Sequence, residues 1–247
     1  MTLALKDQVA VVTGASSGIG RAIAIALGRQ GATLCLLARR RERLEPVAEL
    51  ARADGARALS LETDLSREGD FEALALRVKR ELGGADVLVH SAGVIALGSL
   101  GDATAEELDR QYRVNVRGPY ALTKALLPLL RARPGHIVFV NSSAALGGRA
   151  RIGHYAATKH ALKGLADSLR EEVNADGIRV LTLFLGRTAT PMQAAVHQTE
   201  GRPYRPETLL QPEDVAAMVV SALTLPRTAE VTDIHMRSSK NWRTPEA

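Results

Sequence analysis

The chain has 247 residues, of which 46% are hydrophobic, and this length and apolar content suit a domain with a sizeable core. The formal net charge is +5, but the positive residues are scattered and only 3% of the residues are aromatic, which argues against a nucleic-acid surface that stacks bases. Because the N-terminus carries charges at Lys6 and Asp7, no run of about 18 apolar residues occurs and Cys35 is the single cysteine, we expect a cytoplasmic protein that does not bind a membrane.

Short apolar runs rich in β-branched residues alternate along the chain with longer segments of helical periodicity. Strict alternation predicts right-handed crossovers and therefore an α/β fold, a doubly wound parallel sheet of about seven strands flanked by helices. No linker or repeat divides the chain, so residues 1–247 are predicted to form a single domain. The strands are expected at residues 9–14, 33–38, 57–64, 86–93, 136–143, 178–186 and 230–236, and the main helices at 19–27, 44–53, 71–82, 106–130 and 155–173.

The first strand leads directly into a glycine-rich turn at residues 14–20. One interpretation is a turn that cradles a nucleotide phosphate, with donors from Ser16 and Ser17 and from the amides that open the next helix. The other is a hydrolase elbow with Ser16 as nucleophile, which needs an oxyanion donor from an earlier strand and a histidine such as His197 or His235. No earlier strand is predicted, so the phosphate turn is favoured.

The second strand ends at Ala38, and Arg39 and Arg40 follow it. In dinucleotide sites an acidic residue about 20 positions after the glycine turn contacts the ribose of NAD, whereas an arginine there accommodates the extra phosphate of NADP. Guanidinium groups match the geometry of a phosphate. The sequence therefore favours NADP (NADPH) as cofactor, and a solvated helical turn is the alternative role of these arginines.

Further along, Tyr155 and Lys159 are four residues apart in a predicted helix and therefore share one of its faces. A tyrosine phenol has an unperturbed pKa of about 10, and a neighbouring ammonium favours its phenolate. Ser142 precedes Tyr155 by thirteen residues at the end of a predicted strand, where a hydroxyl can donate to a substrate oxygen. Ser143 is the alternative to Ser142, and a serine pair that completes the strand end is the alternative to a catalytic role.

A set of motifs spans almost the entire chain: Thr13-Gly14-x-x-x-Gly18-x-Gly20, Ser91-Ala92-Gly93, Asn115, Ser142 and Tyr155-x-x-x-Lys159. In this order and spacing they resemble the short-chain dehydrogenase/reductase family. The resemblance implies a Rossmann-like, dinucleotide-binding oxidoreductase domain that transfers a hydride between NADP(H) and a carbonyl or secondary alcohol.

The resemblance also implies roles for individual residues. Tyr155 is implied to be the general acid in reduction and the base in oxidation, Lys159 to bind the nicotinamide ribose and lower the tyrosine pKa, and Ser142 to polarise the carbonyl. Asn115 is implied to kink its helix and to hold a water that connects Lys159 to solvent, and no metal ligand is implied. The residues implied to bind the cofactor are Gly14, Ser16, Ser17, Gly18, Ile19, Gly20, Arg39, Arg40, Asp64, Leu65, Ser91, Ala92, Gly93, Tyr155, Lys159, Thr188 and Thr190.

Within that set, Asp64 and Leu65 are expected at the adenine, residues 91–93 beneath the adenosine ribose, and Thr188 and Thr190 at the nicotinamide carboxamide. The sequence departs from the family at three places: Ser91 replaces the usual asparagine, Leu185 replaces a proline, and the glycine-rich ending is missing.

A substrate lid is expected at residues 191–212, of which 199–212 reads as a long loop with three prolines. Arginines at positions 149, 151 and 187 are near enough in sequence to meet an acidic group, but arginines on loops are usually solvated, so no carboxylate specificity is predicted. The largely apolar pocket is expected to be lined by Ile95, Leu97, Ala144, Leu146, Met192 and Val196.

A homo-oligomer, a tetramer or dimer built from the helices at 104–130 and 153–176, is implied by the resemblance. The tail at 237–247 is expected to reach a neighbouring subunit or to fray. The alternative function is a catalytically silent protein that binds NADP as a sensor or scaffold.

Overall fold

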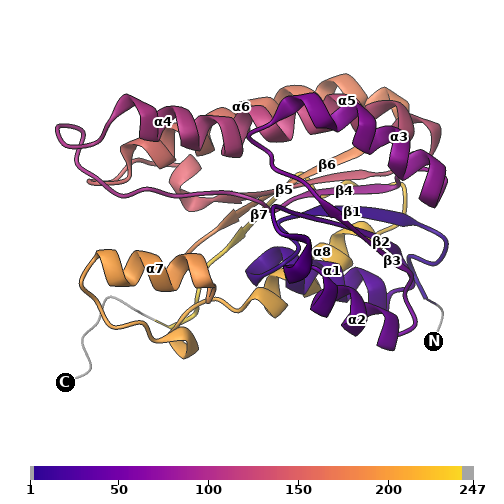
Figure 1. The fold of residues 1–247 in the computed structure, drawn as a ribbon, viewed down its shortest axis with the longest axis horizontal. Helices are drawn as coiled ribbons and strands as arrows, with labels where there is room; N and C mark the ends of the chain where they lie inside the picture. Colours follow the sequence, from indigo (N-terminus) through magenta and orange to yellow (C-terminus); the bar gives the residue numbers. More distant parts are fainter. Residues whose placement is uncertain (1–2, 241–247) are drawn as a thin grey trace.

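The computed structural model describes residues 3–240, and its strands form one parallel sheet in the order β3-β2-β1-β4-β5-β6-β7 (Figure 1). The predicted doubly wound parallel sheet is therefore confirmed. The strand order reverses between β1 and β4, so their connections leave in opposite directions and open a crevice at the carboxyl ends. The strands are β1 (Val9–Thr13), β2 (Thr33–Ala38), β3 (Ala58–Glu62), β4 (Val87–His90), β5 (His136–Ser142), β6 (Arg179–Leu185) and β7 (Asp233–Met236).

Helices cover both faces of the sheet, which explains why the strands read as continuous apolar runs (Figure 1). Side chains alternate between the faces: Ala10 and Val12 of β1 belong to the core beneath α1, α2 and α8, while Val11 belongs to the core beneath α3, α5 and α6. The helices are α1 (Gly18–Arg29), α2 (Glu45–Ala53), α3 (Phe71–Leu82), α4 (Ala105–Tyr112), α5 (Gly118–Ala132), α6 (Gly153–Val173), α7 (Pro191–Thr199) and α8 (Pro212–Leu223).

Three segments differ from the expectation. The helix expected at 106–130 is divided by a π-helical turn, Arg113–Arg117, into α4 and α5. Helix α8 was not expected, and the loop at 199–212 contains a short helical turn, Pro206–Thr208. None of the helices within residues 3–240 is long and apolar enough to cross a membrane.

Candidate active site

A cleft of about 450 Å³ opens at the carboxyl ends of the strands. It includes the end of β1, where the strand order reverses and where sheets of this kind bind ligands. Every residue implied to bind the cofactor lines this cleft, and so does Ser142. The structure therefore brings together residues that are up to 176 positions apart in the sequence, from Gly14 to Thr190.

The turn after β1 is too crowded for side chains at two of its glycines. Gly14 has a φ of 66°, and a Cβ on it would lie 2.9 Å from the Cα of Ala92. A Cβ on Gly20 would lie 2.5 Å from the carbonyl oxygen of Gly14. Ser17, at the N-cap of α1, makes no side-chain capping bond, so the first N–H groups of α1 remain available at the cleft.

Thr13 holds the ends of β1 and β4 together, a role that the sequence analysis did not assign. Its hydroxyl donates to the carbonyl oxygen of Val89 (3.2 Å) and accepts from the backbone N–H groups of Ser91 (3.0 Å) and Ala92 (3.1 Å). The backbone at residues 91–93 is thereby fixed beside the glycine turn. The only sequence signal was the position of Thr13 at the start of the glycine motif.

The far end of the cleft, at the ends of β2 and β3, is positively charged. Arg39, Arg40 and Arg43 line it, and Arg39 and Arg40 are exposed. Burial opposes ionisation of Asp64, but hydrogen bonds from Ser66 and the charge of Arg39 hold the pKa of its carboxyl below the usual range. Arg39 therefore acts electrostatically on Asp64 across this end of the cleft.

Ser142, Tyr155 and Lys159 meet at the opposite end. A side-chain hydrogen bond joins Ser142 to Tyr155, and the Nζ of Lys159 lies 5.7 Å from the centre of the Tyr155 ring. Ser142 also accepts a hydrogen bond from the N–H of Ala144 (3.1 Å), which leaves its hydroxyl proton free to point elsewhere. One hydroxyl, one phenol and one ammonium thus share a small volume.

The lowering of the Tyr155 pKa by Lys159, which the resemblance implies, remains a prediction, because the causes of the shift in the structure are burial and Ser142. Burial raises the pKa of the phenol, and the hydrogen bond from Ser142 only partly opposes that effect. Burial also lowers the pKa of Lys159 to about 8, and its ammonium donates to the carbonyl oxygen of Val140 (3.3 Å). The ammonium is therefore shared with the backbone of β5.

Asn115 lies beneath the cleft and not in its wall. It sits in the π-helical turn and is 1% exposed. Its Nδ2 donates to the carbonyl oxygen of Val94 (2.9 Å) and to the hydroxyl of Thr158 (3.1 Å), while its Oδ1 accepts from the N–H of Val94 (2.8 Å). Asn115 thus connects the segment after β4 to α6, and its implied water remains a prediction.

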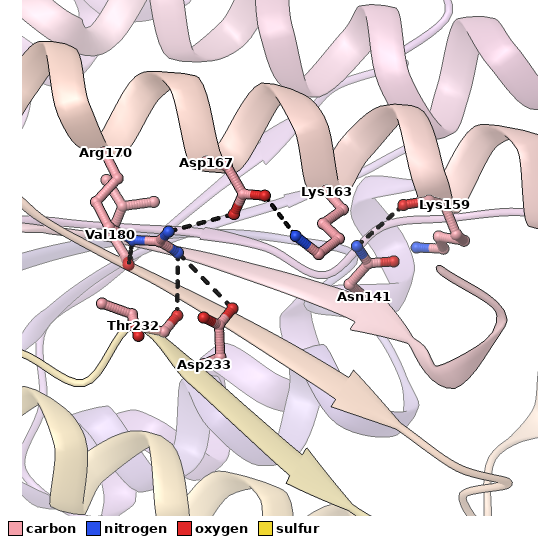
Figure 2. Close-up of polar contacts among 8 residues, drawn as sticks. All are labelled: Asn141, Lys159, Lys163, Asp167, Arg170, Val180, Thr232 and Asp233. Carbon is pink, nitrogen blue, oxygen red and sulfur yellow. Dashed lines mark hydrogen bonds and ion pairs between the residues drawn. The ribbon is translucent and has the colours of Figure 1, made fainter. Parts of the chain in front are cut away.

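Asn141 is a second residue that the sequence analysis did not assign a role. Its Nδ2 donates to the carbonyl oxygen of Lys159 (3.1 Å), and its Oδ1 accepts from the N–H of Ser142 (2.8 Å). Figure 2 shows the first contact, with Asn141 at the end of β5 facing α6. Only the tertiary structure could reveal this contact, because an asparagine at a strand end is common in many settings.

The expected lid, residues 191–212, begins with α7, and contacts of Thr188 and Thr190 hold its two ends. Thr190 caps α7 by accepting from the N–H of Gln193 (3.2 Å), and a Cβ on Gly18 would lie 3.0 Å from its methyl group. Thr188 pairs with Leu210 in an isolated parallel bridge. The two ends of the segment are therefore held together beside the glycine turn.

The C-terminal tail expected at 237–247 is described only as far as residue 240. Ser238 donates to the carbonyl oxygen of Thr208 (2.6 Å), and residues 241–247 lie outside the described residues.

The substrate end of the cleft differs in part from the expectation. Leu146 was expected to line the pocket, but it is absent from the cleft wall and 49% exposed, because the chain turns outward after the helical turn Ser143–Ala145. Arg151 is likewise exposed and outside the wall, whereas Arg149 lies in it. The five expected apolar residues that line the cleft are Ile95, Leu97, Ala144, Met192 and Val196.

Arg187 forms an ion pair with Glu200 (2.6 Å), a partner that the sequence did not suggest. Both line the cleft, and the hydrogen bond from Arg187 holds the pKa of the Glu200 carboxyl below its usual range although burial opposes this. The charge of Arg187 is therefore largely compensated within the protein.

The histidines considered for a hydrolase triad are engaged away from Ser16. The Nδ1 of His197 lies 2.8 Å from the carbonyl oxygen of Gln193, and His235 stacks on Phe184 with ring centres 4.8 Å apart. Among residues 3–240 no group of three or more metal-ligating side chains is found.

Comparisons with known proteins agree with this geometry. Residues 8–201 match the model of the short chain dehydrogenase family. An uncharacterized oxidoreductase of Staphylococcus aureus (strain USA300) is 32% identical over 94% of this chain and 98% of its own length. Glycine betaine reductase ATRR of Emericella nidulans is 35% identical over 93% of this chain, which spans only 18% of that longer protein.

Two solved structures are also similar. An alcohol dehydrogenase from the archaeon Thermococcus sibiricus, complexed with 5-hydroxy-NADP, has a TM-score of 0.86 and 32% identity and covers 97% of this chain and 99% of its own. A short chain dehydrogenase from Burkholderia cenocepacia in complex with NADP has a TM-score of 0.82 and 31% identity over 94% of this chain and 97% of its own. The family model covers most of the chain and the relatives exceed 30% identity. The chain therefore belongs to the short chain dehydrogenase family.

Proposed function

We propose that this protein is an NADP(H)-dependent oxidoreductase that transfers a hydride between the nicotinamide and a carbonyl or secondary alcohol. The observation that carries the proposal is the meeting of Ser142, Tyr155 and Lys159 at one end of a cleft whose other end holds the glycine turn. This arrangement supports the proposal, because a dinucleotide bound along the cleft would bring its reactive end next to a proton donor.

The residues of the cleft fit NADP. A Cβ on Gly14 or Gly20 would intrude on the turn, so only glycine leaves the backbone amides open to a phosphate. Arg39 and Arg40 offer guanidinium groups at the end of β2, where an acidic residue would favour NAD. The similar structures that hold NADP and 5-hydroxy-NADP support the same cofactor here.

In this mechanism the bound nicotinamide supplies the hydride in reduction and accepts it in oxidation. Ser142 donates a hydrogen bond to the substrate oxygen as negative charge develops on it. Tyr155 gives its phenolic proton to that oxygen in reduction and removes it in oxidation. Lys159 binds the nicotinamide ribose, and its charge favours the phenolate of Tyr155. Asn115 holds the segment after β4 against α6. Its proposed role is to hold a water that connects Lys159 to solvent, through which a proton can return to the site.

The substrate class follows from the wall around this end. Apolar side chains dominate it, and Glu200 compensates the charge of Arg187, so a neutral or weakly polar carbonyl compound of small to medium size is favoured. A cytoplasmic location and assembly as a dimer or tetramer complete the proposal.

The test that separates this enzyme from a silent NADP-binding sensor is Tyr155→Phe. The variant keeps the ring and its packing but loses the proton, so we expect NADPH binding to persist while carbonyl reduction falls by about 10²- to 10⁴-fold. The measurement is NADPH consumption across a panel of carbonyl compounds, alongside NADPH binding by fluorescence. Tyr112→Phe, at an exposed position outside the cleft wall, is the matched control. Unchanged turnover in Tyr155→Phe would refute the assignment.

A further inference from the structure

Among the described residues, Asn141 is the one side chain whose hydrogen bonds join Ser142 directly to Lys159. It is 4% exposed and lies in β5, one residue before Ser142. Its acceptor atom faces the N–H of Ser142 and its donor atom faces the carbonyl of Lys159. Since an N–H can only donate and a carbonyl can only accept, these two partners also define the orientation of the amide.

The contact with Lys159 is additional to normal helix bonding. Lys159 lies in the interior of α6, where its carbonyl already has the N–H four residues later as a helical partner. A buried amide directed at such a carbonyl is therefore not needed to satisfy the backbone. It instead fixes how far α6 stands from the end of β5 at this residue.

Lys159 is held to β5 twice, at its backbone by Asn141 and at its ammonium by the carbonyl oxygen of Val140. Tyr155 is one turn earlier on the same helix, and its hydrogen bond to Ser142 spans the same gap between β5 and α6. The separation of β5 and α6 at Asn141 therefore sets the position of all three groups proposed to act on the substrate.

We propose that Asn141 is a positioning residue for the reaction, an amide that fixes Ser142 relative to Tyr155 and Lys159. This inference rests on the proposed function, because it assigns Asn141 a purpose only if those three groups act together. A displacement of about 1 Å in such a site costs on the order of 10²-fold in rate. Asn141 does not need to touch the substrate to have this effect.

The test is Asn141→Ala, with Asn141→Ser as a second variant in case the first fails to fold. Serine retains a short polar group next to Ser142 but cannot reach the carbonyl of Lys159. We expect kcat for carbonyl reduction to fall by about 10- to 100-fold while KM for NADPH changes little. In alcohol oxidation, the pH–rate profile is expected to rise at a pH about one unit higher, because the phenolate of Tyr155 loses its well-placed hydrogen bond from Ser142.

A matched control is Val138→Ala, which perturbs the same strand at a fully buried position in the core beneath α1, α2 and α8, on the sheet face opposite α6. It is expected to lower the unfolding temperature without moving the pH profile. If Asn141→Ala has the same kcat and the same pH–rate profile as Val138→Ala, the positioning role is overturned.

A second readout does not require turnover. Phenolate absorbance is titrated in the unmodified protein and in Asn141→Ala. The spectrum of Tyr155→Phe is subtracted from the first, and the spectrum of the double variant Asn141→Ala, Tyr155→Phe from the second. A rise in the pKa of Tyr155 in Asn141→Ala supports the positioning role even when the substrate panel gives no activity, and an unchanged titration refutes it. Absence of turnover in the unmodified protein, by contrast, refutes the proposed function.

Discussion

At the scale of single residues, the two ends of the cleft use cationic side chains in different surroundings. Arg39 is exposed at the end of β2, whereas Lys159 is 5% exposed beneath Tyr155. An exposed guanidinium is always charged and is available to a phosphate, while a buried ammonium is destabilised until a ligand accompanies it. These differences predict opposite effects when each charge is removed.

Arg39→Ala is expected to weaken NADPH binding by about 10- to 100-fold, the effect of a lost charge-assisted hydrogen bond. NADH binding is expected to change little, because NADH lacks the phosphate that Arg39 is proposed to bind. The measurement is the Kd of each nucleotide by fluorescence titration. Arg41→Ala, two residues later and outside the cleft wall, is the matched control. Equal losses for the two nucleotides would show that Arg39 does not recognise the phosphate.

Lys159→Met is expected to stabilise the cofactor-free protein while it abolishes turnover. Burial lowers the pKa of Lys159 from 10.5 to about 8, so the folded state binds its proton less tightly than the unfolded state. Each unit of such a shift corresponds to about 1.4 kcal/mol, which puts the cost of the charge at about 3 kcal/mol at pH 7.

The stability advantage of Lys159→Met depends on pH, and the sign of this dependence follows from the same shift in the pKa of Lys159. Between pH 8 and 10.5 the unfolded chain carries the proton and the folded protein does not, so this group's destabilisation diminishes as the pH rises. Denaturant unfolding at several pH values should therefore show an advantage of Lys159→Met that is largest below pH 8 and vanishes near 10.5. Lys163→Met, one turn later and 39% exposed, is the control and should show no such advantage. A Lys159→Met protein that is less stable at pH 7 would contradict the prediction.

At the scale of elements, close approaches between backbones create the site. The turn after β1 brings the start of α1 onto the end of β1, and Thr13 fastens β4 to it. On the other side of the cleft, α6 is joined to β5 by Asn141 and to the neighbouring strands by a chain of polar contacts. Figure 2 shows this chain running along α6 from Lys163 through Asp167 to Arg170, which reaches Asp233 of β7. Such contacts hold the helix that carries Tyr155 and Lys159 against the sheet.

Gly20→Ala tests the glycine turn. A Cβ there would lie 2.5 Å from the carbonyl oxygen of Gly14, so the backbone must move. We expect the free energy of unfolding to fall by about 1–3 kcal/mol and NADPH binding to weaken, as measured by denaturant unfolding and nucleotide titration. Gly147→Ala, where a Cβ would meet no atom within 4 Å, is expected to change stability by less than about 0.5 kcal/mol. Similar results for the two variants would mean that the turn tolerates a side chain.

The sequence predicted elements better than contacts. All seven expected strands are present. Buried parallel strands give continuous apolar runs, whereas β7 is partly exposed and begins at Asp233, not at residue 230. The apolar periodicity did not predict the division of α4 from α5 by the π-helical turn Arg113–Arg117, and only the kink implied at Asn115 pointed to it. Motif spacing also predicted which residues would line the cleft. It could not predict Asn141 or Glu200, whose roles depend on how β5 meets α6 and on where α7 ends.

At the scale of the whole molecule, the face that carries α4 and α5 bears exposed aromatic side chains. Tyr112 is 47% exposed and Tyr120 is 56% exposed, and both lie within the segment expected to form an interface between subunits. Tyrosine is enriched at protein interfaces because its ring is apolar and its hydroxyl can still find a partner. These residues make the expected dimer or tetramer testable by substitution.

Light scattering of the unmodified protein is expected to give the mass of a dimer or tetramer, and Tyr120→Arg is expected to reduce that mass. An arginine within an interface would have to bury a charge without a partner, which is unfavourable. Leu76→Arg is the matched control, because Leu76 is 69% exposed on α3, outside the expected interface. A monomer in the unmodified protein, or an equal loss of mass in both variants, would contradict the assignment. Since the cleft is built within one chain, NADPH binding is expected to survive in Tyr120→Arg, which separates assembly from the chemistry of the site.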